Sequence, residues 1–228
     1  MMSGRIAIYG GSFDPFHLGH LVPTVRAQET FHFEAVYFVP AGAPPHKDAA
    51  PLTPVTHRLA MVAMATLPYD GFFTSDDEVF ASRPNYSVHT VRRYQEKFPE
   101  HTMYFILGSD SFSQIATWEQ WEELVDLVHL VVLHRAHMWG DDLVRRIPQR
   151  LVPRLVQVEP FAEVPDPEEL TVYLLNHEPF PISGTSIRNR QRRGQPIREL
   201  VPHEVHSYIE KYRLYHPQAE TEEDHAAD

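Results

Sequence analysis

The chain has 228 residues, 43% of them hydrophobic, so it is long enough to bury a substantial core in one large domain. Its formal net charge of -11 argues against broad nucleic-acid binding, which requires a basic surface, but allows small phosphorylated ligands. The absence of cysteine excludes disulfides and thiolate chemistry. No apolar run is long enough to cross a bilayer and no signal pattern precedes the first strand, so we expect a soluble, cytoplasmic protein without a membrane partner.

The first informative stretch follows a short apolar run. Residues 6–9 predict a buried strand, and a glycine-rich turn at 10–13 separates this strand from a helix expected over about 20–30. Glycine lets the backbone approach a phosphate, and a helix N-terminus supplies free N–H groups and partial positive charge. His17 and His20 fall within one helical turn of each other at that end. The stretch therefore predicts an anion site that contains two imidazoles.

The rest of the chain alternates apolar runs with helical patterns. Further strands are expected at 35–39, 72–74, 103–107, 127–133, 156–158 and 172–175. Helices are expected at 53–65, where Thr53 would be the N-cap and Pro54 the first residue, at 87–97, in a short segment near 118–121, and at 141–150. This alternation predicts an α/β fold with a doubly wound, parallel, Rossmann-like sheet, which binds ligands beyond the carboxyl ends of its strands.

The loops and the end of the chain are marked by composition. Residues 40–47 and the proline- and acid-rich residues 160–169 are predicted loops. The acidic residues 216–228 predict a disordered tail behind a single domain that covers residues 1–215.

A second candidate anion site opens a helix at residues 181–190. The hydroxyls of Ser183 and Thr185, the open N–H groups of a helix start, and Arg188 one turn further on would together form a cradle for phosphate. The alternative is an ordinary N-cap followed by a basic, solvated helix face.

Both stretches resemble the nucleotidylyltransferase superfamily. Residues 11–20 contain its His-Xaa-Gly-His box, and residues 182–188 are similar to its Ile-Ser-Xaa-Thr-Xaa-Ile-Arg motif, with Gly184 where relatives often have a second serine. Class I aminoacyl-tRNA synthetases share a similar box, but they are normally much longer, and the sequence has no Lys-Met-Ser-Lys-Ser-like segment.

Further segments are similar to the bacterial nicotinate-nucleotide adenylyltransferases, over residues 4–215 in all. They are the loop 44–47, the segment 83–90, residues 107–110 with a tryptophan downstream, an arginine after the fifth strand, and the C-terminal stretch 197–215. In the segment 83–90, Tyr86 and Thr90 match the family pattern, whereas Asn85 and Ser87 are variants of it. Residues 136–170 are the least diagnostic part.

The resemblance implies adenylyl transfer from ATP to nicotinate mononucleotide, giving the deamido dinucleotide and pyrophosphate. It implies that His17, His20 and Arg188 stabilise phosphate charge, with phosphate favouring the charged imidazoles. The ATP site would comprise Gly10, Gly11, Ser12, Phe13, His17, His20, Gly108, Asp110, Ile182, Ser183, Thr185 and Arg188. The acceptor site would comprise His46, Lys47, Tyr86, Ser87, Thr90, Trp118 and Arg135. Mg²⁺ would be carried mainly by ATP, with no metal site built by the protein.

Other interpretations stay open at this point. The same two signatures would occur in a superfamily transferase acting on pantetheine phosphate or on a cytidylyl acceptor. A regulatory module that binds nucleotides without turnover is a second alternative, and a zinc-binding module built on the two histidines is a third. The sequence identifies no oligomer interface, although small homo-oligomers are common.

Overall fold

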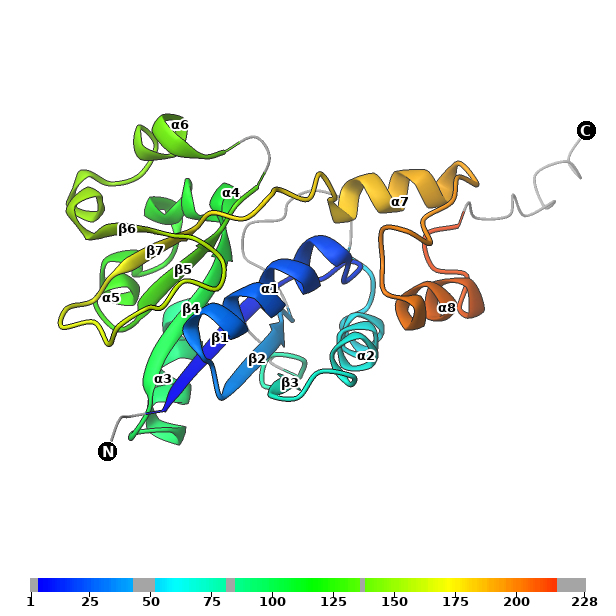
Figure 1. Ribbon diagram of the computed structural model, residues 1–228. Helices are drawn as coiled ribbons and strands as arrows, with labels where there is room; N and C mark the ends of the chain where they lie inside the picture. Colours follow the sequence, from blue (N-terminus) through cyan, green and yellow to red (C-terminus); the bar gives the residue numbers. More distant parts are fainter. Residues whose placement is uncertain (1–3, 43–51, 81–84, 136–137, 217–228) are drawn as a thin grey trace, which may run out of the picture.

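The computed structural model describes residues 4–42, 52–80, 85–135 and 138–216 (Figure 1). Within them, all the strands belong to one parallel sheet, with the order β3-β2-β1-β4-β5-β7-β6. The strands are β1 (Arg5–Gly11), β2 (Ala35–Pro40), β3 (Phe72–Thr74), β4 (Thr102–Gly108), β5 (His129–Leu133), β6 (Leu155–Val158) and β7 (Val172–Leu175). The predicted fold class is therefore confirmed.

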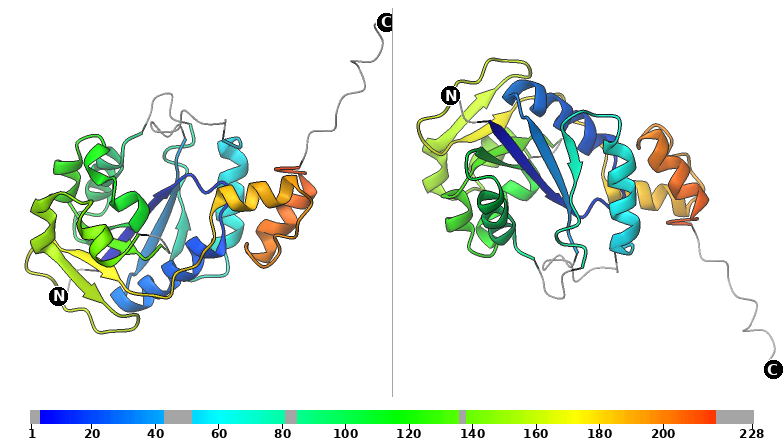
Figure 2. Two further views of the ribbon diagram at one scale, coloured as in Figure 1. Left: turned by 90° about the horizontal axis from the view of Figure 1, so that it is seen from above. Right: turned by 90° about the horizontal axis from the view of Figure 1, so that it is seen from below.

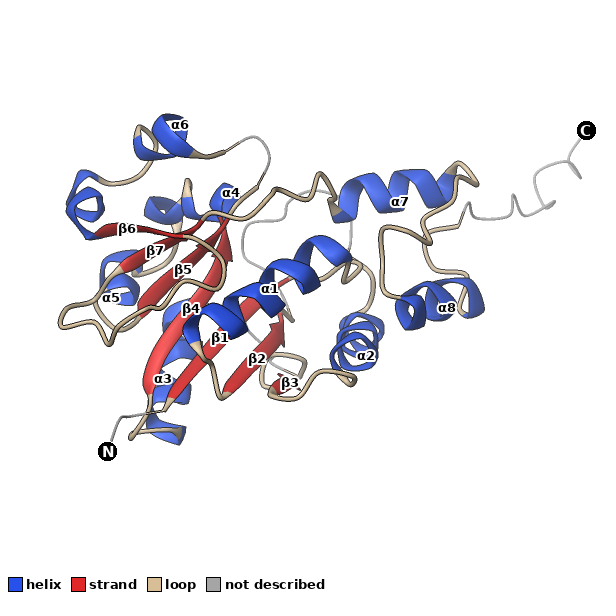
Figure 3. Ribbon diagram, in the orientation of Figure 1, coloured by secondary structure: helices blue, strands red, loops and turns tan. Residues whose placement is uncertain are grey.

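Helices lie on both faces of this sheet (Figure 3). The α-helices are α1 (Leu18–Phe31), α2 (Val55–Thr66), α3 (Ser87–Lys97), α4 (Ser109–Phe112), α5 (Trp121–Val125), α6 (Gly140–Val144), α7 (Gly184–Arg192) and α8 (His203–Lys211). The two 3₁₀ helices are η1 (Ile115–Thr117) and η2 (Gln149–Arg154).

The alternation of side chains along the strands creates two separate cores. In β1, Ala7 and Tyr9 join the core under α1, α2, α7 and α8, whereas Ile6 and Ile8 join the core under α3 to α6. Helices α7 and α8 stand together beside α2 at one side of the molecule (Figures 1 and 2). They bring the second signature to the end of the sheet where β1 terminates.

Several predicted boundaries are wrong in detail. Helix α2 begins at Val55, so Pro54 takes the N-cap position; the Thr53 N–H instead points to the Asp14 carboxylate at 3.4 Å. The expected helix 141–150 is interrupted, since α6 ends at Val144 and a 3₁₀ helix starts only after Pro148, which lacks the N–H that a continuous helix needs.

Another boundary concerns the fifth strand. Strand β5 starts at His129 rather than at 127, because Leu127 N–H still bonds to Leu124 O in the turn that ends α5. The first helix begins at Leu18, two residues earlier than expected, which puts both histidines at its very start.

Candidate active site

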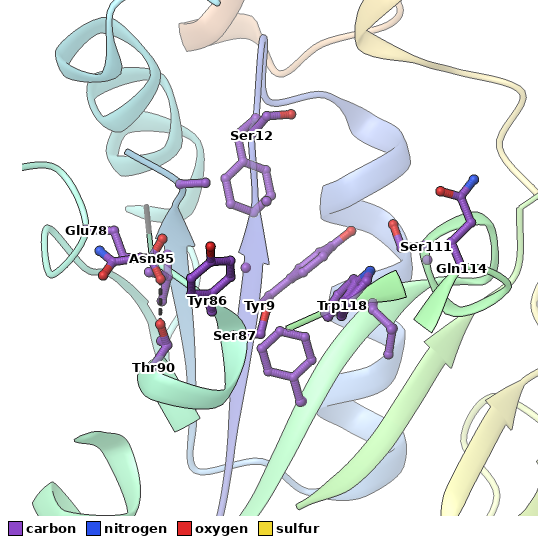
Figure 4. Close-up of a pocket in the computed structure, with 18 of the residues that line it drawn as sticks. Tyr9, Ser12, Glu78, Asn85, Tyr86, Ser87, Thr90, Ser111, Gln114 and Trp118 are labelled. Atoms are coloured by element: carbon purple, nitrogen blue, oxygen red, sulfur yellow. Dashed lines mark hydrogen bonds between the residues drawn. The ribbon is translucent and has the colours of Figure 1, made fainter. Parts of the chain in front are cut away.

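An open cleft of about 740 Å³ lies at the carboxyl ends of β1, β2 and β4 (Figure 4). Strand order reverses between β1 and β4, and ligands of doubly wound sheets bind at such a switch point. In Figure 4, Glu78, Asn85 and Thr90 lie toward one side of the cleft and Ser111 and Gln114 toward the other. The cleft therefore occupies the place where the fold predicts a ligand.

His17 and His20 form a stacked pair at the start of α1. His17 is the N-cap residue, and the two imidazole centroids are 3.7 Å apart with an interplanar angle of 21°. The backbone N–H of His17 donates to Nδ1 of His20 at 3.3 Å, so the proton of a neutral His20 ring is on Nε2. His20 lines the cleft, whereas His17 is 2% exposed and lies behind it. The pair thus presents one imidazole to a ligand and buries the other.

Burial favours the neutral form of both rings. Burial, reinforced by the charge of Arg135, lowers the pKa of His17 to about 3. Burial followed by the neighbouring His17 and Arg135 lowers the pKa of His20 well below its ordinary value. The Nδ1 atom of His17 is buried without a hydrogen-bond partner among the described residues. That bound phosphate favours the charged form of the two imidazoles stays a prediction.

Arg135 lies at the histidine end of the cleft. Its backbone N–H donates to Ser109 Oγ at 2.9 Å, and its Nη2 is 3.5 Å from the hydroxyl of Tyr9. Room for the guanidinium depends on glycine, since a Cβ on Gly19 would lie 3.1 Å from its Nη1 and one on Gly108 would lie 3.1 Å from its Nε. The arginine thus places a fixed positive charge beside both imidazoles.

Arg58 ties together three segments under the cleft. This side chain belongs to α2 and is 1% exposed. It donates to Ser12 O at 2.7 Å, Ala41 O at 2.7 Å and Thr53 O at 2.9 Å. A buried guanidinium requires such partners, and here they come from the turn after β1, the residue after β2 and the residue before the N-cap of α2.

The second signature forms a capped helix start. The hydroxyl of Ser183 accepts from the N–H of Ser186 at 3.1 Å, which makes it the N-cap of α7. One turn further on, Arg188 donates through Nη1 to Asp14 O at 2.5 Å and through Nη2 to Thr185 Oγ1 at 3.2 Å. The second signature is thereby joined to the turn that leads to His17.

The glycine at position 184 is explained by the close approach of α7 to the backbone of Asp14. A Cβ at this position would lie 2.6 Å from the carbonyl oxygen of Asp14, a backbone atom that can move only with its loop. Glycine therefore permits the close approach of α7 to Asp14.

A buried polar chain closes the other side of the cleft. The hydroxyl of Thr90 donates to Glu78 Oε1 at 2.5 Å and accepts from Arg93 Nη2 at 3.1 Å. Burial raises the pKa of the Glu78 carboxyl, partly offset by the hydrogen bond from Thr90 and the charge of Arg93. Tyr86 and Ser87 open α3 on the same side, with Tyr86 as N-cap. The proton of the Thr90 hydroxyl is thus engaged by Glu78.

Aromatic side chains form the floor between these two sides (Figure 4). The half-buried Trp118 ends η1 and meets Phe105 edge to face, with centroids 6.2 Å apart. Tyr9 meets His20 in a similar edge contact, with centroids 6.1 Å apart. A planar base or ring can stack in such a cleft.

The structure brings together most of the predicted site residues. Those that line the cleft are Gly10, Gly11, Ser12, Phe13, His20, Tyr86, Ser87, Thr90, Gly108, Asp110, Trp118 and Arg135. The predicted site residues outside its lining are His17, Ile182, Ser183, Thr185 and Arg188, of which Arg188 bonds to Asp14 in the loop before α1. His46 and Lys47 lie outside the described residues.

Several cleft residues were missed by sequence reasoning. They include Tyr9, Glu78, Asn85, Ser111, Gln114 and Thr117. Glu78 follows two other acidic residues, and no local pattern shows which of the three turns inward. The described residues contain no cluster of three side chains suited to hold a metal, and no described helix is long and apolar enough to cross a membrane.

Comparison with known proteins identifies the class to which this fold and cleft belong. Residues 8–190 match the family model described as cytidylyltransferase-like. Among curated relatives, the probable nicotinate-nucleotide adenylyltransferase of Desulfatibacillum aliphaticivorans is 36% identical, covering 92% of this chain and 99% of that protein. The probable nicotinate-nucleotide adenylyltransferase of Geobacter sulfurreducens is 35% identical, with coverage of 92% and 98%. The chain therefore belongs to the nicotinate-nucleotide adenylyltransferase family and is a nucleotidyltransferase enzyme.

A solved structure shares the fold. The nicotinic acid mononucleotide adenylyltransferase of Plasmodium falciparum, complexed with NaAD, aligns with a TM-score of 0.70 at 22% identity, covering 93% of this chain and 97% of that one. The same protein complexed with APC gives a TM-score of 0.69. At this identity the likeness concerns the fold.

Proposed function

We propose that the chain transfers the adenylyl group of ATP to nicotinate mononucleotide, yielding deamido-NAD and pyrophosphate in NAD biosynthesis. The single observation that carries the proposal is the placement of His20, Arg135 and an aromatic floor in one cleft at the strand ends. Full-length relatives with the nicotinate-nucleotide name support the choice of acceptor. One catalytic domain would cover residues 1–215.

The reaction requires little covalent chemistry from the protein. A phosphate oxygen of the mononucleotide forms a bond to the α-phosphorus of ATP, the bond from that phosphorus to the bridging oxygen breaks, and pyrophosphate leaves with the electron pair. Because the nucleophile is already an anion, no general base is needed. The protein must position two polyanions and stabilise the charge between them.

The histidine end of the cleft is assigned to the phosphates. His20 would donate from Nε2 to a phosphate oxygen, and Arg135 would add positive charge beside it. The backbone of Gly10, Gly11, Ser12 and Phe13 would lie along the triphosphate. Ser183, Thr185 and Arg188 would hold the β- and γ-phosphates, and Ile182 would position the start of α7. His17 would support His20 through the stacked contact.

The remaining cleft residues are assigned to the nucleosides. Asp110, in the first turn after β4, would contact the adenosine ribose. Gly108 has no side chain, so the ribose could come close to the backbone there. Trp118 would stack on the pyridine, and Tyr86, Ser87 and Thr90 would face its carboxylate. His46 and Lys47 would contact phosphates.

Mg²⁺ would arrive with ATP and neutralise phosphate charge. Phosphate oxygens and water would supply most of the ligands of the ion, as Mg²⁺ prefers. No step is assigned to a metal held by the protein.

Pyrophosphate release tests the proposal directly. The purified enzyme would be given ATP and Mg²⁺ with nicotinate mononucleotide, nicotinamide mononucleotide or phosphopantetheine at equal concentration. We expect strong preference for nicotinate mononucleotide. Release with phosphopantetheine alone would show that the proposed acceptor is wrong. No release with any of the three would contradict the proposed enzyme activity and favour a protein that only binds nucleotides.

A further inference from the structure

The C-terminal turn reaches back to the loop that leads into the histidine pair. The hydroxyl of Tyr215 donates a hydrogen bond to Oδ1 of Asp14 at 2.6 Å, although the two residues are 201 positions apart. To make this contact the chain turns sharply after α8, with Arg213 at φ 52° and Tyr215 at φ 65°. Residues other than glycine rarely adopt this left-handed conformation, so the contacts of the turn must hold it in place.

Asp14 is the junction of three segments. Its side chain is 3% exposed, and its carboxylate receives Tyr215, the N–H of Thr53 at 3.4 Å and the guanidinium of Arg188 at 3.7 Å. Its carbonyl also accepts from Arg188. A buried carboxylate keeps its orientation only while its donors stay in place. The Arg188 guanidinium thus contacts both the carbonyl and the carboxylate of the residue that Tyr215 holds.

The hydroxyl of Tyr215 is a donor that does not lose its proton near neutral pH. Burial and the charge of Asp14 raise the pKa of the Tyr215 hydroxyl, so it keeps its proton at neutral pH. Tyr215 itself is half-buried and packs with Leu214 against the core on the α1 and α8 side of the sheet. It does not line the cleft, and its hydrogen bond to Asp14 is the contact through which it can act on the reaction.

We propose that Tyr215 is a positioning residue for the use of ATP: by fixing the Asp14 carboxylate, it sets Arg188 and the entry to α1 in the geometry that receives the triphosphate. This inference rests on the proposed function. It links the last turn of the described chain to both anion-binding signatures through one hydrogen bond.

The test compares Tyr215→Phe with Tyr208→Phe. Each change removes one hydroxyl from the C-terminal unit; that of Tyr208 meets His57 Nδ1 at 2.9 Å and contacts neither Asp14 nor the cleft. For Tyr215→Phe we expect kcat/KM for ATP to fall about tenfold, the effect of losing one hydrogen bond to a charged group, with the acceptor KM unchanged within about twofold. Tyr208→Phe should keep the wild-type kcat/KM for ATP and the wild-type KM for the acceptor. Both variants should remain folded, with a cooperative thermal transition at a Tm close to that of the wild type.

Two outcomes would overturn the proposal. One is wild-type ATP kinetics in Tyr215→Phe, and the other is an equal loss in both variants, which would indicate a general structural role. Failure of the proposed function has a different signature, namely no pyrophosphate release by the wild type. In that event calorimetry of ATP binding decides: weaker binding in Tyr215→Phe alone supports the positioning role, and equal binding in the wild type and both variants excludes it.

Discussion

The imidazoles of His17 and His20 stack at 3.7 Å, yet only His20 lines the cleft. His20 is therefore the ring that can reach a ligand, and His17 is the buried ring that stacks against it. His17 fixes Nδ1 of His20 through its backbone N–H, and this leaves Nε2 of His20 as a donor. The first prediction follows from this arrangement.

His20→Ala should reduce turnover by about two orders of magnitude or more, the cost of removing one donor to charge that develops in the transition state. The measurement is pyrophosphate release at saturating ATP and acceptor. His32→Asn is the control from the same helix, since His32 is its left-handed C-cap, a conformation that asparagine tolerates. Near-normal turnover in His20→Ala would remove this residue from the mechanism.

Trp118→Ala should raise the KM for the mononucleotide severalfold and leave the KM for ATP nearly unchanged, because a lost stacking contact costs about 1 kcal/mol beyond its buried area. Trp121→Ala is the matched control: this tryptophan packs under Arg150 and does not line the cleft. A rise in the KM for ATP instead would place the adenine, rather than the pyridine, against Trp118.

Arg58→Lys should lower the free energy of unfolding by about 2 kcal/mol, because Arg58 uses three separate nitrogens to reach its three carbonyls, whereas the lysine donors all lie on one nitrogen. These carbonyls belong to Ser12, Ala41 and Thr53, so we also expect a reduced kcat/KM for ATP. Urea unfolding and steady-state kinetics check the two effects. The exposed Arg145 provides the control Arg145→Lys. Equal stability in both variants would show that the buried contacts contribute nothing.

Stability should fall on acidification below about pH 6.5. Burial lowers the pKa of His17 to about 3 and those of His129 and His177 to about 4, and it lowers that of His20 as well. In this pH range the unfolded chain binds protons that the folded chain does not, so the free energy of unfolding decreases as pH falls. We expect a total loss of at least ~2 kcal/mol between pH 7.5 and pH 5 in urea unfolding.

His129→Gln isolates one share of that effect. His129 begins β5, at the opposite end of the strand from the cleft, and its Nδ1 accepts from Thr171 N–H at 3.1 Å, a bond that the glutamine oxygen can replace. The variant should show a shallower dependence of stability on pH and unchanged turnover. An unchanged pH dependence would mean that His129 takes up no proton on unfolding.

The sequence by itself determined the order of strands and helices along the chain and the two helix starts that we propose bind phosphate, because periodicity, glycine turns and caps are local signals. Most of the predicted cleft residues came from the resemblance of local motifs to a known family, and the parallel sheet explains why those at strand ends lie together. Sequence reasoning misjudged the helix at 141–150, where Pro148 interrupts the hydrogen bonds, and the start of β5, where a turn persists through Leu127.

Only the tertiary structure decided how side chains distant in sequence pair. It buried His17, placed Arg135 beside the imidazoles, engaged Thr90 with Glu78, and joined Tyr215 to Asp14. Each of these contacts depends on the packing of several segments at once. Packing sets which donor meets which acceptor, and no pattern within one segment encodes it.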